Sequence, residues 1–83
     1  MTQAIMTRYI GPSNSRGSRI KATAWGGSVT VAYNDADNSE KNHARAAQAL
    51  CAKMGWHQTG WVGGGTPDGR GWCYVAADAY DRF

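Results

Sequence analysis

The chain has 83 residues and a mass of 8.9 kDa, which leaves room for one small core. Hydrophobic residues make up 42% of it. Many of these are alanine, so the four Trp and four Tyr residues must supply much of the buried area. We therefore expect one folded domain over residues 1–83, which excludes a multidomain enzyme.

The net charge is +3 and the sequence pI is about 9.1, a balance that favours anionic partners. Two cysteines are too few for a disulfide scaffold, and the first residues lack the apolar stretch of a secretory signal. No segment approaches the ~20 apolar residues of a membrane span. We expect a protein of the bacterial cytoplasm with reduced thiols and no membrane contact.

Three segments of alternating β-forming residues come first in the chain. A long stretch rich in Gly, Ser and Asn separates the first two, and a pair of glycines precedes the third. Segments joined in this way predict an antiparallel meander. The predicted strands are residues 3–10, 19–25 and 28–33.

The pattern then changes to that of a helix. Asp37 stands three residues before Glu40, a capping-box arrangement, and Gly55 suits the position that ends a helix. The alanine-rich segment between them predicts a helix over residues 38–54. Its apolar spacing predicts a buried face that consists of Ala44, Ala47, Leu50, Cys51 and Met54.

The remaining residues predict two short strands joined by a glycine-rich loop, with a turn at Pro67-Asp68-Gly69. In the second of these strands, either Trp72 and Tyr74 or Cys73 and Val75 face the core, and in the latter case Cys73 is a neighbour of Cys51. The element order is β-β-β-α-β-β. We expect an α+β fold, a twisted antiparallel sheet with the helix packed on one face.

The sequence contains no pattern that indicates catalysis, a metal or a cofactor. The glycine-rich loop lacks the Gly-Lys-Ser/Thr ending of a phosphate-binding loop, because Gly69 is followed by Arg70. The Cys and His residues lack the spacing of a zinc site, and no His is tied by spacing to a nucleophile. We therefore expect a non-enzymatic protein without a metal or cofactor.

Basic residues are the strongest functional signal. Alternation places Arg19 and Lys21 on one face of the second strand, together with Trp25, and Ile20 on the other. A second set steps by multiples of four along one side of the helix and is expected to face solvent. If Ile20 faces the helix, the two basic areas lie on opposite sides of the domain, which argues against one continuous nucleic-acid groove.

Trp61 and Arg70 flank the glycine-rich loop, and Trp and Arg are the residue types that most often dominate interfaces. Together with the basic residues they form the candidate partner-binding set. Its members are Arg16, Arg19, Lys21, Lys41, Arg45, Lys53, Trp61 and Arg70.

From about Tyr9 to Tyr74 the chain resembles a family of small proteins encoded by bacterial phages, plasmids and integrated elements. The resemblance rests on a strand with SRGSRIKA, a strand with VTVAY, a helix with KNHARAAQALCAKMGW, and the stretch GWVGGG. Ala32 departs from it, because a proline is usual there. Some members of the family resemble anti-CRISPR proteins against type I systems.

The resemblance implies a non-enzymatic inhibitor that binds Cas subunits of a type I surveillance complex (Cascade) and blocks target DNA binding or nuclease recruitment. The positive charge then favours an acidic protein patch or nucleic acid in that complex as the contact. The alternative from composition is a small basic nucleic-acid-binding accessory protein of a phage or mobile element. A homo-oligomer joined through exposed Trp side chains or an edge strand is a third hypothesis.

Overall fold

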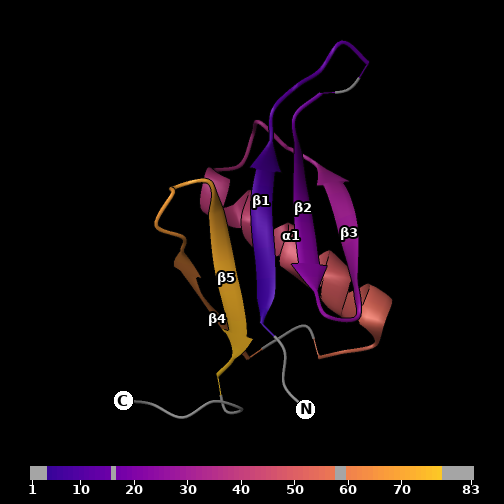
Figure 1. The fold of residues 1–83 in the computed structure, drawn as a ribbon, viewed down its shortest axis with the longest axis vertical. Coiled ribbons are helices and arrows are strands. Elements are labelled where there is room, and N and C mark those ends of the chain that lie inside the picture. The colour runs from indigo at the N-terminus through magenta and orange to yellow at the C-terminus, as the bar shows by residue number, and fades with distance from the viewer. Residues whose placement is uncertain (1–3, 16, 58–59, 78–83) are drawn as a thin grey trace.

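The computed structural model describes residues 4–15, 17–57 and 60–77. They form a five-stranded antiparallel sheet in the order β3-β2-β1-β5-β4, and one helix lies across one of its faces (Figure 1). This confirms the predicted α+β fold and the order β-β-β-α-β-β. The elements are β1 (Ile5–Ile10), β2 (Arg19–Ala24), β3 (Gly27–Ala32), α1 (Ser39–Met54), β4 (Trp61–Gly65) and β5 (Gly71–Ala76).

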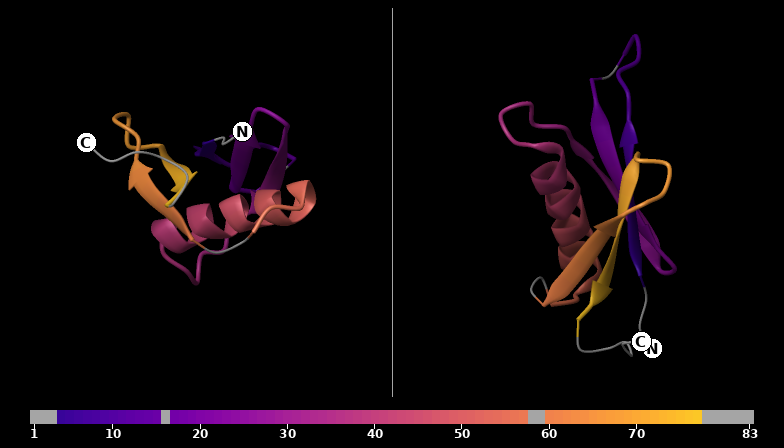
Figure 2. Two further views of the ribbon diagram at one scale, coloured as in Figure 1. Left: turned by 90° about the horizontal axis from the view of Figure 1, so that it is seen from below. Right: turned by 90° about the vertical axis from the view of Figure 1, so that its left-hand side faces the viewer.

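The covered face of the sheet supplies half of the core. Figure 2 shows α1 on one side of the strands, with no element on the other side. Ile5 of β1 and Ile20 of β2 are fully buried, as is Ala22. The small side chains of Ala22, Ala46 and Ala47 occupy part of the contact between helix and sheet. The core consists of Ile5, Ile20, Ala22, Ala46, Ala47, Leu50, Cys51 and Tyr74.

The helix begins one residue later than the capping box predicted. Asn38 is its N-cap, because the backbone there is extended and the Asn38 Oδ1 accepts a hydrogen bond from the Lys41 N–H at 2.8 Å. Asp37 belongs to the preceding turn, in which its N–H donates to the Asn34 carbonyl at 3.1 Å. The predicted end is confirmed, since Gly55 takes the left-handed conformation with φ 74°.

The buried face of α1 contains two polar residues that the apolar spacing did not include. Asn42 is fully buried and its amide nitrogen donates to the carbonyls of Asn34 and Asn38, both at 2.9 Å. Its Oδ1 accepts from the Asn34 N–H at 2.7 Å. One side chain therefore fixes the loop between β3 and α1. Ala46 and His43 are also buried, whereas the predicted Ala44 and Met54 are only half-buried.

Replacing Asn42 with alanine removes the hydrogen bonds that its buried side chain makes to the part-buried backbone groups of Asn34 and Asn38. We expect Asn42→Ala to lower the free energy of unfolding by roughly 1–3 kcal/mol, because each of these bonds is lost and the part-buried groups are incompletely hydrated. Urea denaturation followed by circular dichroism measures this. Asn14→Ala, at an exposed loop position, is the control and should change stability little. Equal stability of the two variants would contradict the role given to Asn42.

A second buried polar contact ties three elements together. The Thr7 Oγ1 on β1 shares a hydrogen bond with the His43 Nδ1 on α1 at 2.7 Å, and it accepts from the Trp72 N–H on β5 at 3.2 Å. Thr7 and His43 are each 2% exposed. Burial lowers the pKa of His43 below its usual value. The neutral imidazole is therefore the form that the folded protein favours.

This lowered pKa makes stability depend on pH. Above about pH 6.5 His43 is neutral in both the folded and the unfolded chain. Below it the unfolded chain binds a proton that the folded protein resists, so the free energy of unfolding should fall as pH drops from 7.5 to 5.5. Urea denaturation across this range should show the fall in the wild type and in His57→Gln, which alters an exposed histidine. His43→Gln should remove it; an unchanged slope there would refute the assignment.

The two cysteines lie on different sides of the sheet. Tyr74, whose side chain is buried beneath the helix, precedes Val75 and follows Cys73 on β5, so alternation turns Cys73 to the other face. Cys73 pairs with Met6 of β1, and its thiol is free, as is that of Cys51 in the core. Of the two alternatives for this strand, the structure thus has Trp72 and Tyr74 on the helix side.

Within the described ranges, no helix has the length and apolarity needed to cross a membrane.

Candidate binding surface

The face of the sheet turned away from α1 is not covered by any described element (Figure 2), and we call it the open face. Residues paired across antiparallel strands point to the same side, so the register defines its members. Met6 pairs with Thr23 and Cys73, and Arg8 pairs with Lys21. The open face of β1, β2 and β5 comprises Met6, Arg8, Ile10, Arg19, Lys21, Thr23, Cys73 and Val75.

Two cations lie directly opposite each other on this face. Arg8 of β1 and Lys21 of β2 are cross-strand partners, both exposed. Like charges at directly opposed positions destabilise a sheet. Arg19 lies two pairs further along, on the same face and opposite Ile10, and its guanidinium donates to the Gly17 carbonyl at 3.3 Å. The row therefore concentrates positive charge at some cost to stability.

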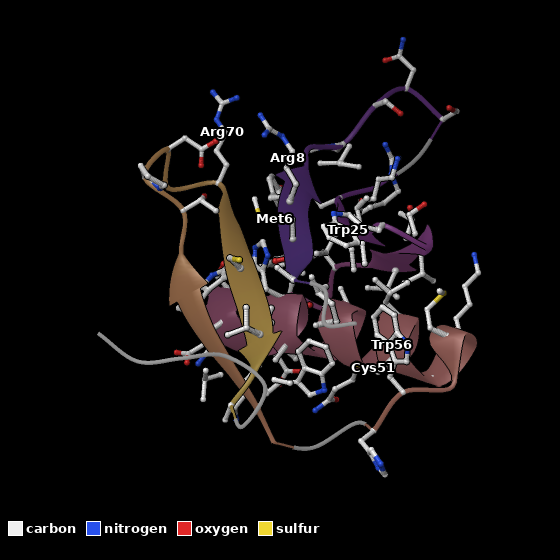
Figure 3. All side chains as sticks on the ribbon, turned by 60° about the horizontal axis from the view of Figure 1, so that its bottom comes forward. Met6, Arg8, Trp25, Cys51, Trp56 and Arg70 are labelled. Carbon is white, nitrogen blue, oxygen red and sulfur yellow. The ribbon has the colours of Figure 1, made fainter. Side chains whose placement is uncertain are left out.

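The turn between β4 and β5 adds a fourth cation beside this row. Figure 3 shows Arg70 and Arg8 extending to the same side of the molecule, away from α1. The turn is fixed by Asp68, whose Oδ1 accepts from the Thr66 hydroxyl at 2.6 Å and from the Arg70 N–H at 3.0 Å. These two hydrogen bonds lower the pKa of Asp68, so its carboxylate stays ionised. Arg70 is thus presented from an ordered turn.

Asp68 is also the acid nearest to Arg8, with its Oδ2 3.7 Å from the guanidinium nitrogen. Both side chains are at least half exposed, so this ion pair contributes little. Asp68 also attracts Arg70 electrostatically, whereas Lys21 has no ion-pair partner among the described residues. Among the described residues of the open face and its adjoining turn, cations exceed acids.

A shallow groove of about 470 Å³ runs between this turn and the strands. Its floor is apolar, because Met6 is 49% exposed there and Ile10 lies beside it. Arg8 and Lys21 form part of its wall. An apolar floor with a cationic wall can hold an anionic partner that also carries apolar or aromatic groups. The remaining lining residues are Thr7, Thr23, Thr66, Pro67, Asp68 and Gly71.

The basic residues of the helix lie on the other side of the molecule, and two of them have structural partners. The Arg45 guanidinium donates to the Asp37 carboxylate at 3.1 Å and to the Ala32 carbonyl at 3.4 Å. The Lys53 Nζ donates to the Ser28 carbonyl at 2.7 Å. The helix stripe is therefore not a free basic surface, although Lys41 is exposed. Because Ile20 faces the helix, the two basic areas lie on opposite sides, as the alternation predicted.

The other members of the predicted set divide as follows. Trp61 is half-buried, stacks on Trp56 with ring centroids 6.0 Å apart, and donates from Nε1 to the His57 carbonyl at 2.8 Å. It belongs to the packing at the edge of the core. Arg70, Arg19 and Lys21 gather around the open face. Arg16 lies outside the described residues.

The sequence pattern did not place Arg8 or Met6 on this surface, although Arg8 is one of the basic residues that carry the functional signal. Their alternation in the first strand was visible, but the face they occupy depends on register with the second strand. The intervening loop of residues 11–18 is too long to set that register from turn type alone. Only the pairing of Arg8 with Lys21 shows that the two cations meet.

No protein-family model, curated protein or solved structure matches the chain. Over the described ranges, no three His, Cys, Asp or Glu side chains gather in a way that could hold a metal ion. The open face is therefore described as a candidate binding surface from its positive charge and its groove alone.

The cost of opposing Arg8 and Lys21 can be measured. We expect Lys21→Gln to raise the free energy of unfolding by about 0.2–1 kcal/mol at low salt, because it removes the like-charge pair. The gain should shrink as salt screens the repulsion. Lys21→Arg, which keeps the positive charge opposite Arg8, is the matched control and should show no such gain. A Lys21→Gln variant less stable than wild type at low salt would contradict the repulsion.

Proposed function

We propose that this protein is a non-enzymatic inhibitor of a type I CRISPR surveillance complex and acts in the bacterial cytoplasm through its open face. The observation that carries the choice of face is the pairing of Arg8 with Lys21 on an uncovered side of the sheet. The choice of target comes from the resemblance to small phage and mobile-element proteins, among them type I anti-CRISPR-like ones. Its counterpart is an anionic surface of the complex, either an acidic patch of a Cas subunit or bound nucleic acid.

Three physical features support this proposal. A surface that lies on paired strands and a hydrogen-bonded turn loses little conformational freedom on binding. Arg8 and Arg70 provide planar, multiply donating groups that suit carboxylates and phosphates alike. An anionic partner would also remove the repulsion between Arg8 and Lys21, so part of the cost stored in the free protein returns as binding energy.

The test uses a purified, guide-loaded type I complex and its double-stranded target DNA. Wild-type protein should associate with the complex and reduce target binding in a gel-shift assay. Lys21→Glu should raise the concentration needed for half-inhibition at least tenfold, because it reverses the charge at the centre of the row. Lys41→Glu makes the same change on the helix and should inhibit as wild type does.

Two results would count against the proposal. A wild-type protein that neither associates with the complex nor alters DNA binding or cleavage would refute the inhibitor function. Equal inhibition by Lys21→Glu and Lys41→Glu would keep the function but remove the open face as its contact.

The second candidate is direct binding of single-stranded nucleic acid, and one observation favours it. Trp25 lies in the turn that follows β2, one residue beyond the strand whose outward alternation was predicted to include it, and its side chain is 77% exposed. Figure 3 shows where it stands relative to Met6 and Arg8. Exposed aromatic rings on basic proteins are groups on which bases stack.

Fluorescence anisotropy with a labelled single-stranded oligonucleotide tests this second candidate. Affinity should fall steeply with salt, and Trp25→Ala should weaken binding roughly tenfold, as loss of a stacking platform does. Lys41→Glu again serves as the control. If wild type does not bind at low salt, direct nucleic-acid binding is ruled out.

A further inference from the structure

The two edge strands of the sheet differ in whether their outward backbone groups have hydrogen-bond partners. β3 forms one edge, and the bond from the Tyr33 N–H to the Ser18 carbonyl shows which of its residues face β2. By alternation, the backbone groups of Ser28 and Ala32 point outward. Lys53 covers the Ser28 carbonyl and Arg45 covers the Ala32 carbonyl. Cations from the helix thus occupy the carbonyls of Ser28 and Ala32, two of the three outward-facing residues of β3.

β4 forms the other edge, and its outward groups are identified in the same way. The Ala77 N–H donates to the Gly60 carbonyl at 2.7 Å and the Thr66 N–H to the Gly71 carbonyl at 2.9 Å, so even-numbered residues of β4 face β5. Hence the N–H and C=O groups of Trp61, Gly63 and Gly65 point away from the sheet. In the part of the chain that the structure describes, no segment pairs with them.

This edge also lacks the usual protection. Edge strands are normally blunted by charged side chains, proline or a bulge. β4 reads Trp-Val-Gly-Gly-Gly and contains neither a charge nor a proline. Its last three residues carry no side chains, and four of its five residues are exposed. A strand with this composition offers its backbone for pairing.

The side chains of β4 fit those of a second β4 strand that runs antiparallel to it. In an antiparallel pair centred on Gly63, Trp61 of one copy lies opposite Gly65 of the other, and Val62 lies opposite Gly64. Each large side chain then faces a glycine, so the two strands approach without collision. The residues whose backbone points outward, Trp61, Gly63 and Gly65, fall in the positions that exchange two hydrogen bonds per pair.

We propose that β4 is a self-association edge, through which two copies of this chain join their sheets into one continuous antiparallel sheet. The partner is a second copy of the chain, because the β4 strand itself supplies both the large side chains and the glycines that lie opposite them. Val62, which is 54% exposed, lies beside the partner strand in the pair. The proposal does not depend on the proposed function.

The expected strength follows from size. Stable complexes bury at least about 1,200 Å² in total, and a contact of one five-residue strand per copy is smaller. The dimer should therefore form in the micromolar range or above and exchange rapidly. Two-fold pairing of this kind turns both open faces to the same side, which would double the cationic surface available to one partner.

Sedimentation equilibrium between about 10 µM and 1 mM tests the proposal directly. The mass should rise with concentration from 8.9 kDa toward twice that value. Gly65→Pro removes an outward N–H without disturbing the bonds to β5, and a Cβ at Gly65 meets no atom within 4 Å. We expect this variant to weaken association at least tenfold.

The matched control is Thr30→Pro, which removes an outward N–H from the opposite edge and should dimerise as wild type does. Val62→Lys provides a second test that keeps the backbone intact, and added salt should partly restore its association. Circular dichroism checks the fold of each variant. A wild type that stays monomeric up to 1 mM, or folded Gly65→Pro and Val62→Lys variants that dimerise as wild type does, would overturn the proposal.

Discussion

Close packing of α1 against the sheet is the constraint on which the other features depend. Ala22 of β2 and Ala46 and Ala47 of α1 are nearly or fully buried at this contact, and their small side chains let the helix approach the strands closely. That approach brings Arg45 and Lys53 within reach of the carbonyls of β3. It also covers the central part of one face of the sheet, whereas the other face is left to solvent.

The two faces of the sheet consequently differ in how their polar and charged side chains are arranged. On the covered face, Asn42 holds a loop and Thr7 joins α1 to β5 through His43 and Trp72, whereas the buried Tyr74 hydroxyl has no hydrogen-bond partner among the described residues. On the open face, Arg8 is placed opposite Lys21 although this arrangement is unfavourable. A local conflict that the fold does not need is typical of a functional surface.

Much of the fold could be predicted from the sequence, because alternation, glycine turns and an alanine-rich segment are local signals. The strands and helix fall close to their predicted ranges, and the outward placement of Lys21 follows from alternation alone. The burial of Asn42 and the roles of Arg45 and Lys53 were not predictable in this way. They depend on which carbonyls the folded chain brings near a long side chain, and that is a tertiary property.

The separation of the two cysteines has a practical chemical consequence. Cys51 is buried in the core, where burial raises the pKa of its thiol and disfavours the reactive thiolate. Cys73 is half-buried on the open face, between Met6 of β1 and Gly64 of β4. An alkylating fluorophore should therefore attach at Cys73 first. The natural sequence thus carries its own attachment point for a reporter, beside the basic row and next to the β4 strand.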